Sequence, residues 1–105
     1  MRQYEQVVVL KGIGYEVIKL LVPCYVDENY DDAIVGEFDV YYLARRIRSF
    51  DNVQTFRNFE DCFNWCYSRM AHQFEAKLED GLNTDFLQDD SRKLFDLARQ
   101  YGLTA

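Results

Sequence analysis

This chain of 105 residues is poor in the residues that interrupt regular structure and in those that build metal or catalytic centres. It contains one proline, five glycines, three cysteines and one histidine. Because 49% of the residues are hydrophobic and 16% are aromatic, the chain is not intrinsically disordered. We expect residues 1–105 to form a single domain whose core needs no disulfide or metal.

Long hydrophobic runs are also missing. No apolar run approaches the roughly 18 residues that a membrane-spanning helix requires. The N-terminal sequence MRQYEQVVVLKG has a short apolar run and no small-residue cleavage site, so we expect no secretory signal. These absences predict a cytoplasmic protein that makes no membrane contact and keeps its thiols reduced.

Basic residues are absent from residues 27–39, which hold six carboxylates. The net charge of the chain is −6, so this acidic segment carries as much negative charge as the whole protein. Such an excess disfavours direct binding to nucleic acid, because phosphate groups repel it. An opposite bias follows in residues 40–58, where a single aspartate accompanies four arginines: Arg45, Arg46, Arg48 and Arg57.

Residues 57–78 form the longest segment with one unbroken period. Apolar residues recur there at helical spacing and form one wide stripe: Phe59, Phe63, Cys66, Tyr67, Met70, Phe74 and Leu78. Asn58 is the predicted N-cap and Gly81 the predicted stop. The spacing predicts a helix that packs this stripe against the core, with Trp65 about 100° away from Cys66 on the helical wheel.

A second helical pattern follows Gly81. Its apolar face contains Leu94, Leu97, Ala98 and Tyr101, and Gly102 ends it. Two starting points fit the pattern. Either Asp89, Asp90 or Ser91 caps the helix, or a longer helix begins at Thr84.

The first half of the chain is rich in strand-forming residues. Residues 4–11 and 15–26 predict two strands joined by a hairpin through Gly12 and Gly14, although residues 15–22 also fit a helical face. Residues 34–42 predict a third strand, and residues 43–50 fit either a strand or a helix. Residues 53–56 are expected to be extended.

Strands followed by helices indicate the α+β class. We therefore predict a small antiparallel sheet of about three strands, packed against two C-terminal helices. The side chains expected to face the helices are Val7, Val9, Val17, Leu21, Phe38 and Val40.

No pattern in the chain builds a metal, cofactor or catalytic site. Cys62 and Cys66 lie on adjacent turns of the predicted helix, but His72 points elsewhere, so the three cannot converge on one ion. The acidic segment starts like a calcium loop, yet Asp32 and Phe38 occupy the positions that need glycine and glutamate. We expect no metal, no cofactor and no enzymatic activity.

Two features remain as candidates for function, the acidic segment and Trp65. Carboxylates interleaved with aromatic residues would attract a basic surface, and Trp and Tyr are frequent anchors in protein interfaces. We predict that the protein binds a partner protein with a basic surface. The predicted partner-binding residues are Asp27, Glu28, Tyr30, Asp31, Asp32, Glu37 and Trp65.

Two alternatives stay open at this point. The four arginines Arg45, Arg46, Arg48 and Arg57 could hold a phosphate-bearing ligand or a nucleotide, and Trp65 could lie in a contact between copies of the chain. In size, acidity and aromatic richness the chain resembles the small acidic inhibitors that phages encode against host nucleic-acid machinery, including anti-CRISPR proteins. This resemblance in bulk properties implies a non-catalytic inhibitor.

Overall fold

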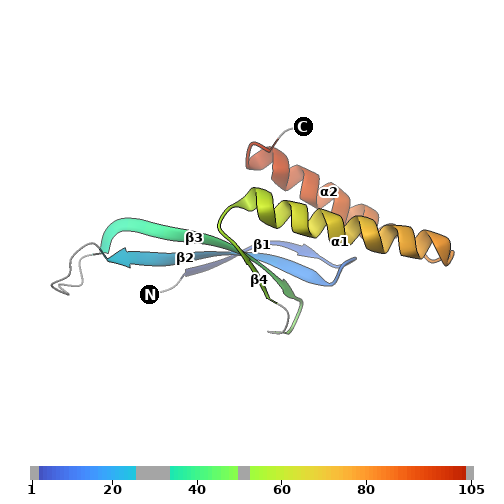
Figure 1. The fold of residues 1–105 in the computed structure, drawn as a ribbon, viewed down its shortest axis with the longest axis horizontal. Coiled ribbons are helices and arrows are strands. Elements are labelled where there is room, and N and C mark those ends of the chain that lie inside the picture. The colour runs from blue at the N-terminus through green and yellow to red at the C-terminus, as the bar shows by residue number, and fades with distance from the viewer. Residues whose placement is uncertain (1–2, 26–33, 50–52, 104–105) are drawn as a thin grey trace.

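The computed structural model describes residues 3–25, 34–49 and 53–103. Four strands and two helices follow in chain order: β1 (Gln3–Leu10), β2 (Tyr15–Tyr25), β3 (Ile34–Arg46), β4 (Gln54–Phe56), α1 (Phe59–Glu79) and α2 (Asp85–Gln100). The strands form one antiparallel sheet in the order β1-β2-β3-β4, and both helices pack against it (Figure 1). The predicted α+β class is confirmed. The short strand β4 brings the count to four, where about three were predicted.

The hairpin between β1 and β2 forms as the glycines predicted. Gly14 has a φ of 75°, in the left-handed region that favours glycine, and its N–H donates to the carbonyl of Leu10 at 2.9 Å. Strand β2 pairs along most of its length with β1 and with β3. The strand interpretation of residues 15–22 is therefore confirmed over the helical one.

A β-bulge in β1 changes which of its side chains face the helices. The register shifts between Gln6 and Val8, so that Val8 pairs with Val17 on the core side and Val9 falls on the opposite face. The prediction that Val9 faces the helices is wrong for this reason, and Val8 takes its place. Val17 is buried, and Val7 and Val40 pack against the core as predicted.

Strand β3 continues through residues that fitted either a strand or a helix. Its pairing with β2 reaches Arg46, which lies opposite Tyr15. Arg48, with a φ of 64°, lies beyond the end of the strand. The long partner strand therefore decides the conformation of residues 43–46, because helix formation there would break this ladder.

Both helices begin and end near the predicted signals. The side-chain oxygen of Asn58 accepts a hydrogen bond from the N–H of Asp61 at 2.8 Å, and Gly81, just past α1, has a φ of 68°. Helix α2 starts after Thr84, so the longer of the two alternatives is correct and Asp90 lies within the helix. Among the residues that the structure describes, no helix is long and apolar enough to cross a membrane.

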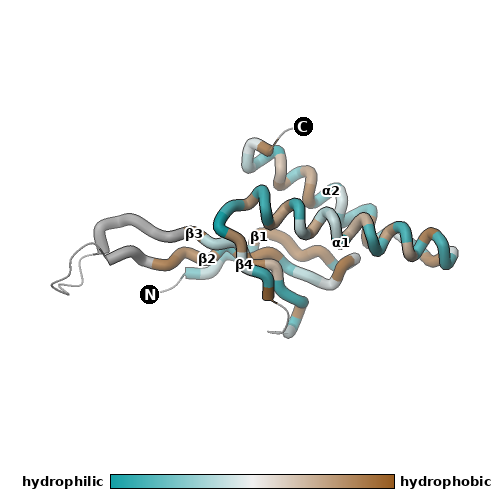
Figure 2. The backbone as a smooth tube through the Cα atoms, in the orientation of Figure 1, coloured by the Kyte–Doolittle hydropathy of each residue, from teal (hydrophilic) through white to brown (hydrophobic). Residues whose placement is uncertain are grey.

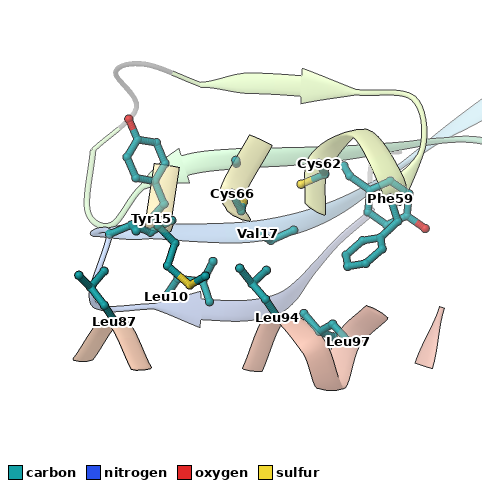
Figure 3. Close-up of a cluster of buried hydrophobic side chains, with 13 residues drawn as sticks. Leu10, Tyr15, Val17, Phe59, Cys62, Cys66, Leu87, Leu94 and Leu97 are labelled. Atoms are coloured by element: carbon teal, nitrogen blue, oxygen red, sulfur yellow. The ribbon is translucent and has the colours of Figure 1, made fainter. Parts of the chain in front are cut away.

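The core lies between the sheet and the two helices (Figure 3). The sheet contributes Leu10, Tyr15 and Val17; helix α1 contributes Phe59, Cys62, Cys66 and Met70; and helix α2 contributes Leu87, Leu94 and Leu97. Both helical cysteines are free and completely buried. A hydrogen bond with Cys66, together with burial, raises the pKa of the Cys62 thiol, so the thiol stays protonated.

Strands β2 and β3 extend away from the part of the sheet that the helices cover (Figure 1). The molecule measures 62 × 31 × 15 Å along its principal axes. A long hairpin therefore projects from a thin two-layer body, and its far end lies away from both helices.

Candidate interaction surface

Most of the predicted partner-binding residues lie outside the described part of the chain. These are Asp27, Glu28, Tyr30, Asp31 and Asp32; Glu37 belongs to β3, but its side chain is also outside the description. The structure places the two strand ends on either side of residues 26–33, which contain four of the six carboxylates. Tyr25, at the end of β2, pairs with Ile34, at the start of β3, on the hairpin end that points away from the helices (Figure 1). The binding role of these residues stays a prediction.

Trp65 packs on the side of α1 that faces the sheet. Its ring is partly buried, with centroid distances of 5.1 Å to Tyr15 and 6.3 Å to Phe56. The guanidinium of Arg69 lies 5.5 Å from the indole centroid and 4.7 Å from that of Tyr15. These contacts give Trp65 a packing role between α1 and the sheet, and a role in partner binding stays a prediction.

The four arginines of the alternative ligand site do not all share one face. Arg45 and Arg46 are neighbours on β3, so their side chains project to opposite faces of the sheet. Arg46 and Arg48 are exposed. The guanidinium of Arg57 lies 4.7 Å from the ring centroid of Tyr41. A single anion site formed by all four would need side chains from both faces of the sheet.

Arg45 belongs to a polar row across β1, β2 and β3. Its Nε donates to Glu16 Oε1 at 2.6 Å, and Gln6 Nε2 donates to Glu16 Oε2 at 2.8 Å. Glu16 is only 7% exposed. Burial raises the pKa of its carboxyl, but the hydrogen bonds from Arg45 and Gln6 outweigh burial, so the pKa lies below its ordinary value.

This polar row borders a shallow hollow of about 420 Å³ on the sheet face opposite the core. Its lining residues are Tyr4, Gln6, Glu16, Ile18 and Arg45. Both carboxylate oxygens of Glu16 already accept hydrogen bonds within the chain. Gln6, Glu16 and Arg45 in this hollow therefore stabilise the sheet by pairing with one another.

A second surface, which the sequence did not reveal, lies where α1 meets α2. Phe63 and Tyr67 of α1 and Phe95 of α2 form an aromatic cluster, with ring centroids 5.8 to 6.0 Å apart. Tyr67 is 41% exposed and Phe95 is 46% exposed. The expectation that the whole stripe of α1 faces the core is wrong for Tyr67 and for Leu78, which is also exposed.

The aromatic cluster separates two hollows between the helices, each bordered by one glutamate. The first, of about 350 Å³, is lined by Glu60, Phe63, Asn64, Phe95, Ala98, Gly102 and Leu103. The second, of about 360 Å³, is lined by Tyr67, Met70, Ala71, Phe74, Glu75, Leu87, Gln88 and Ser91. The two hollows and the aromatic cluster together are called the inter-helix groove below.

One sequence signal does point to the inter-helix groove. The apolar stripe of α1 is too wide for one core contact, since Trp65 extends the apolar surface further around the helix. Because α1 turns Trp65 and Cys66 towards the core, the opposite edge of the stripe reaches the solvent beside α2. Hydrophobic and hydrophilic positions accordingly alternate along both helices (Figure 2).

Comparison of the chain with protein-family models, with curated proteins and with solved structures gave no match. The inference of function therefore rests on the charge, the exposed side chains and the internal contacts of this chain.

Proposed function

We propose that this protein is a small, acidic, non-catalytic interaction protein that binds a basic surface of a partner protein in the cytoplasm. The observation that carries the proposal is the charge distribution, with six carboxylates and no basic residue in residues 27–39. A concentrated negative field accelerates encounter with a basic surface and selects against acidic partners. Surfaces that bind nucleic acid are basic, so a nucleic-acid-binding protein is the preferred target class.

In this proposal the protein acts as an inhibitor. By covering a basic surface, it would exclude the nucleic acid that the surface otherwise binds. The resemblance in bulk properties to phage-encoded inhibitors, including anti-CRISPR proteins, supports the same interpretation. The long hairpin adds to this support, because Tyr25 and Ile34, the strand ends that precede and follow residues 26–33, lie away from both helices (Figure 1).

Several basic groups in the described part of the chain are engaged by the chain's own carboxylates. Arg45 pairs with Glu16, Arg99 pairs with Asp96, and both Arg92 and Lys93 pair with Asp89. Arg45 and Arg46 also lie on opposite faces of the sheet. These arrangements favour the partner-protein proposal over a phosphate or nucleotide site built from the four arginines.

Affinity capture from a lysate of the source organism at low and at high salt tests the proposal. We expect a nucleic-acid-binding protein to be captured at low salt and to be released as the salt concentration rises, because attraction between surface charges is screened. Capture of a partner with an acidic surface, or capture that salt leaves unchanged, would contradict the proposal.

A further inference from the structure

We infer that the inter-helix groove is the site that grips an amphipathic, basic helix of the partner. The basic character of this helix rests on the proposed function, whereas its apolar contacts rest on the groove itself. The groove would supply short-range contacts and the acidic segment long-range attraction. Two separate surfaces would thus bind one partner.

The aromatic cluster provides the first argument. Single exposed apolar residues are ordinary, but contiguous aromatic rings at a groove mark sites of association. Phe63, Tyr67 and Phe95 contact one another already, so a bound partner would find them ordered. Preordered rings lose little conformational freedom on binding, which favours affinity.

The spacing of the two hollows identifies the shape of the occupant. On α1, one hollow is lined by residues 60–64 and the other by residues 67–75. Their centres are therefore about nine residues apart, or about 13 Å along the helix axis. A bound helix presents side chains on one face at roughly 10 to 12 Å when they are two turns apart. Two large apolar anchors at that spacing would enter one hollow each and straddle the aromatic cluster.

The charges beside the hollows identify the chemistry of the occupant. Glu60 borders one hollow and Glu75 the other. Neither glutamate forms an ion pair with any residue in the described ranges, whereas the nearby Arg92 and Arg99 are paired with aspartates of α2. A lysine or arginine next to each apolar anchor would therefore find a carboxylate at each hollow.

The same charges argue against a second copy of this chain as the occupant. Each copy has a net charge of −6, so approach of two copies is opposed by long-range repulsion. A symmetric contact would also bring the Glu60 and Glu75 carboxylates of both copies into one interface without basic partners. The structure thus favours a basic chain over a self-contact.

A pair of synthetic helical peptides tests this inference on the full-length protein. Both carry two leucines seven residues apart on one face; one has lysines beside each leucine and the other has glutamates. We expect the lysine peptide to bind with a Kd in the micromolar range, and the glutamate peptide to bind at least about tenfold more weakly, by calorimetry at low salt.

Two exposed phenylalanines of α2 provide a matched pair of variants. Phe95 lines the groove, whereas Phe86, which is 64% exposed, lines neither hollow. Phe95→Ser should weaken binding of the lysine peptide at least about tenfold, and Phe86→Ser should leave it within about twofold. Thermal melting of both variants confirms that each is folded.

Glutamates of α1 provide the corresponding test of charge. Glu60→Gln and Glu75→Gln should each weaken the lysine peptide about threefold at low salt and less at high salt. Glu79→Gln is the control, because Glu79 is exposed on the same helix but borders neither hollow.

Each of four outcomes would overturn the inference. The first is no binding of the lysine peptide at about millimolar concentration. The second is equal weakening by Phe86→Ser and Phe95→Ser. The third is a dimer in light scattering that Phe95→Ser dissociates, because a second copy would then occupy the groove. If the captured partner still binds the Phe95→Ser variant with full affinity, this inference fails while the proposed function stands.

Discussion

The carboxylate of Asp90 in α2 accepts a hydrogen bond from the backbone N–H of Ile13, with 2.9 Å between Oδ2 and N, across 77 residues of sequence. This carboxylate is completely buried. Asp90 therefore fastens α2 to the turn between β1 and β2. Because α2 forms one wall of the inter-helix groove, the same contact positions the groove.

Gly12 is required at this turn because of the close approach of α2. A Cβ at residue 12 would lie 2.5 Å from Asp90 Oδ2 and 2.8 Å from the backbone N of Leu87. We expect Gly12→Ala to lower the free energy of unfolding by about 2–3 kcal/mol. Gly14→Ala is the control, since residue 14 has open space and only a positive φ, which costs about 1 kcal/mol. If urea denaturation gave the same loss of unfolding free energy for Gly12→Ala and Gly14→Ala, the close approach of α2 to Gly12 would not be the cause.

Ionisation of Asp90 should destabilise the fold. Burial raises the pKa of its carboxyl above the ordinary value of 3.8, although the backbone N–H groups of Gly12 and Ile13 act in the opposite direction. Because the folded-state pKa is raised, the contribution of Asp90 to stability is largest below pH 3.8. That contribution falls as pH rises through the folded-state pKa. The unfolding free energy of the Asp90→Asn variant, relative to that of the wild type, should therefore be higher at neutral than at acidic pH. A difference in unfolding free energy that does not change with pH would contradict this.

Glu16 should show the opposite pH dependence. Its folded-state pKa lies below 4.5, so its ion pair stabilises the protein above pH 4.5 and is lost as pH falls through the folded-state pKa. We expect Glu16→Gln to cost about 1–3 kcal/mol at neutral pH and much less in acid. Chemical denaturation at several pH values measures the difference, and Gln6→Ala is a control that leaves Arg45 paired. A loss that persists unchanged in acid would rule out the ion pair as its cause.

Replacement of Trp65 separates packing from partner binding. Because its ring contacts Tyr15 and Phe56, Trp65→Ala should lower the free energy of unfolding by about 2–4 kcal/mol. Trp65→Phe should retain most of that stability. If Trp65→Ala melts at the wild-type temperature but no longer binds the captured partner, the packing role is wrong and Trp65 is an interface anchor.

Local signals in the sequence were sufficient for much of the fold. The Asn58 cap, the glycine stops at Gly81 and Gly102, and the hairpin at Gly14 each depend on a few neighbouring residues. Strands followed by helices then indicated the α+β class. These features are local, so no knowledge of distant contacts was needed.

The remaining features depend on distant contacts. The bulge at Val7 reverses the alternation of β1, and only the pairing with β2 reveals it. Asp90 resembled a helix cap in the sequence, yet it binds a turn 77 residues away. The exposure of Tyr67 follows from how α1 turns towards the sheet, which a helical wheel does not show. The width of the apolar surface on α1 was visible in the sequence, but the edge of it that reaches the solvent, and so the position of the groove, was not.

The central claim is that the acidic segment binds a basic partner, and reversing its charge tests this most directly. The measurement is the Kd of the captured partner for the wild type and for the variant Asp27→Lys, Asp31→Lys, Asp32→Lys at low salt. We expect the variant to bind at least about tenfold more weakly while its Tm stays within a few degrees of the wild type. An unchanged Kd in a folded variant would contradict the proposed function.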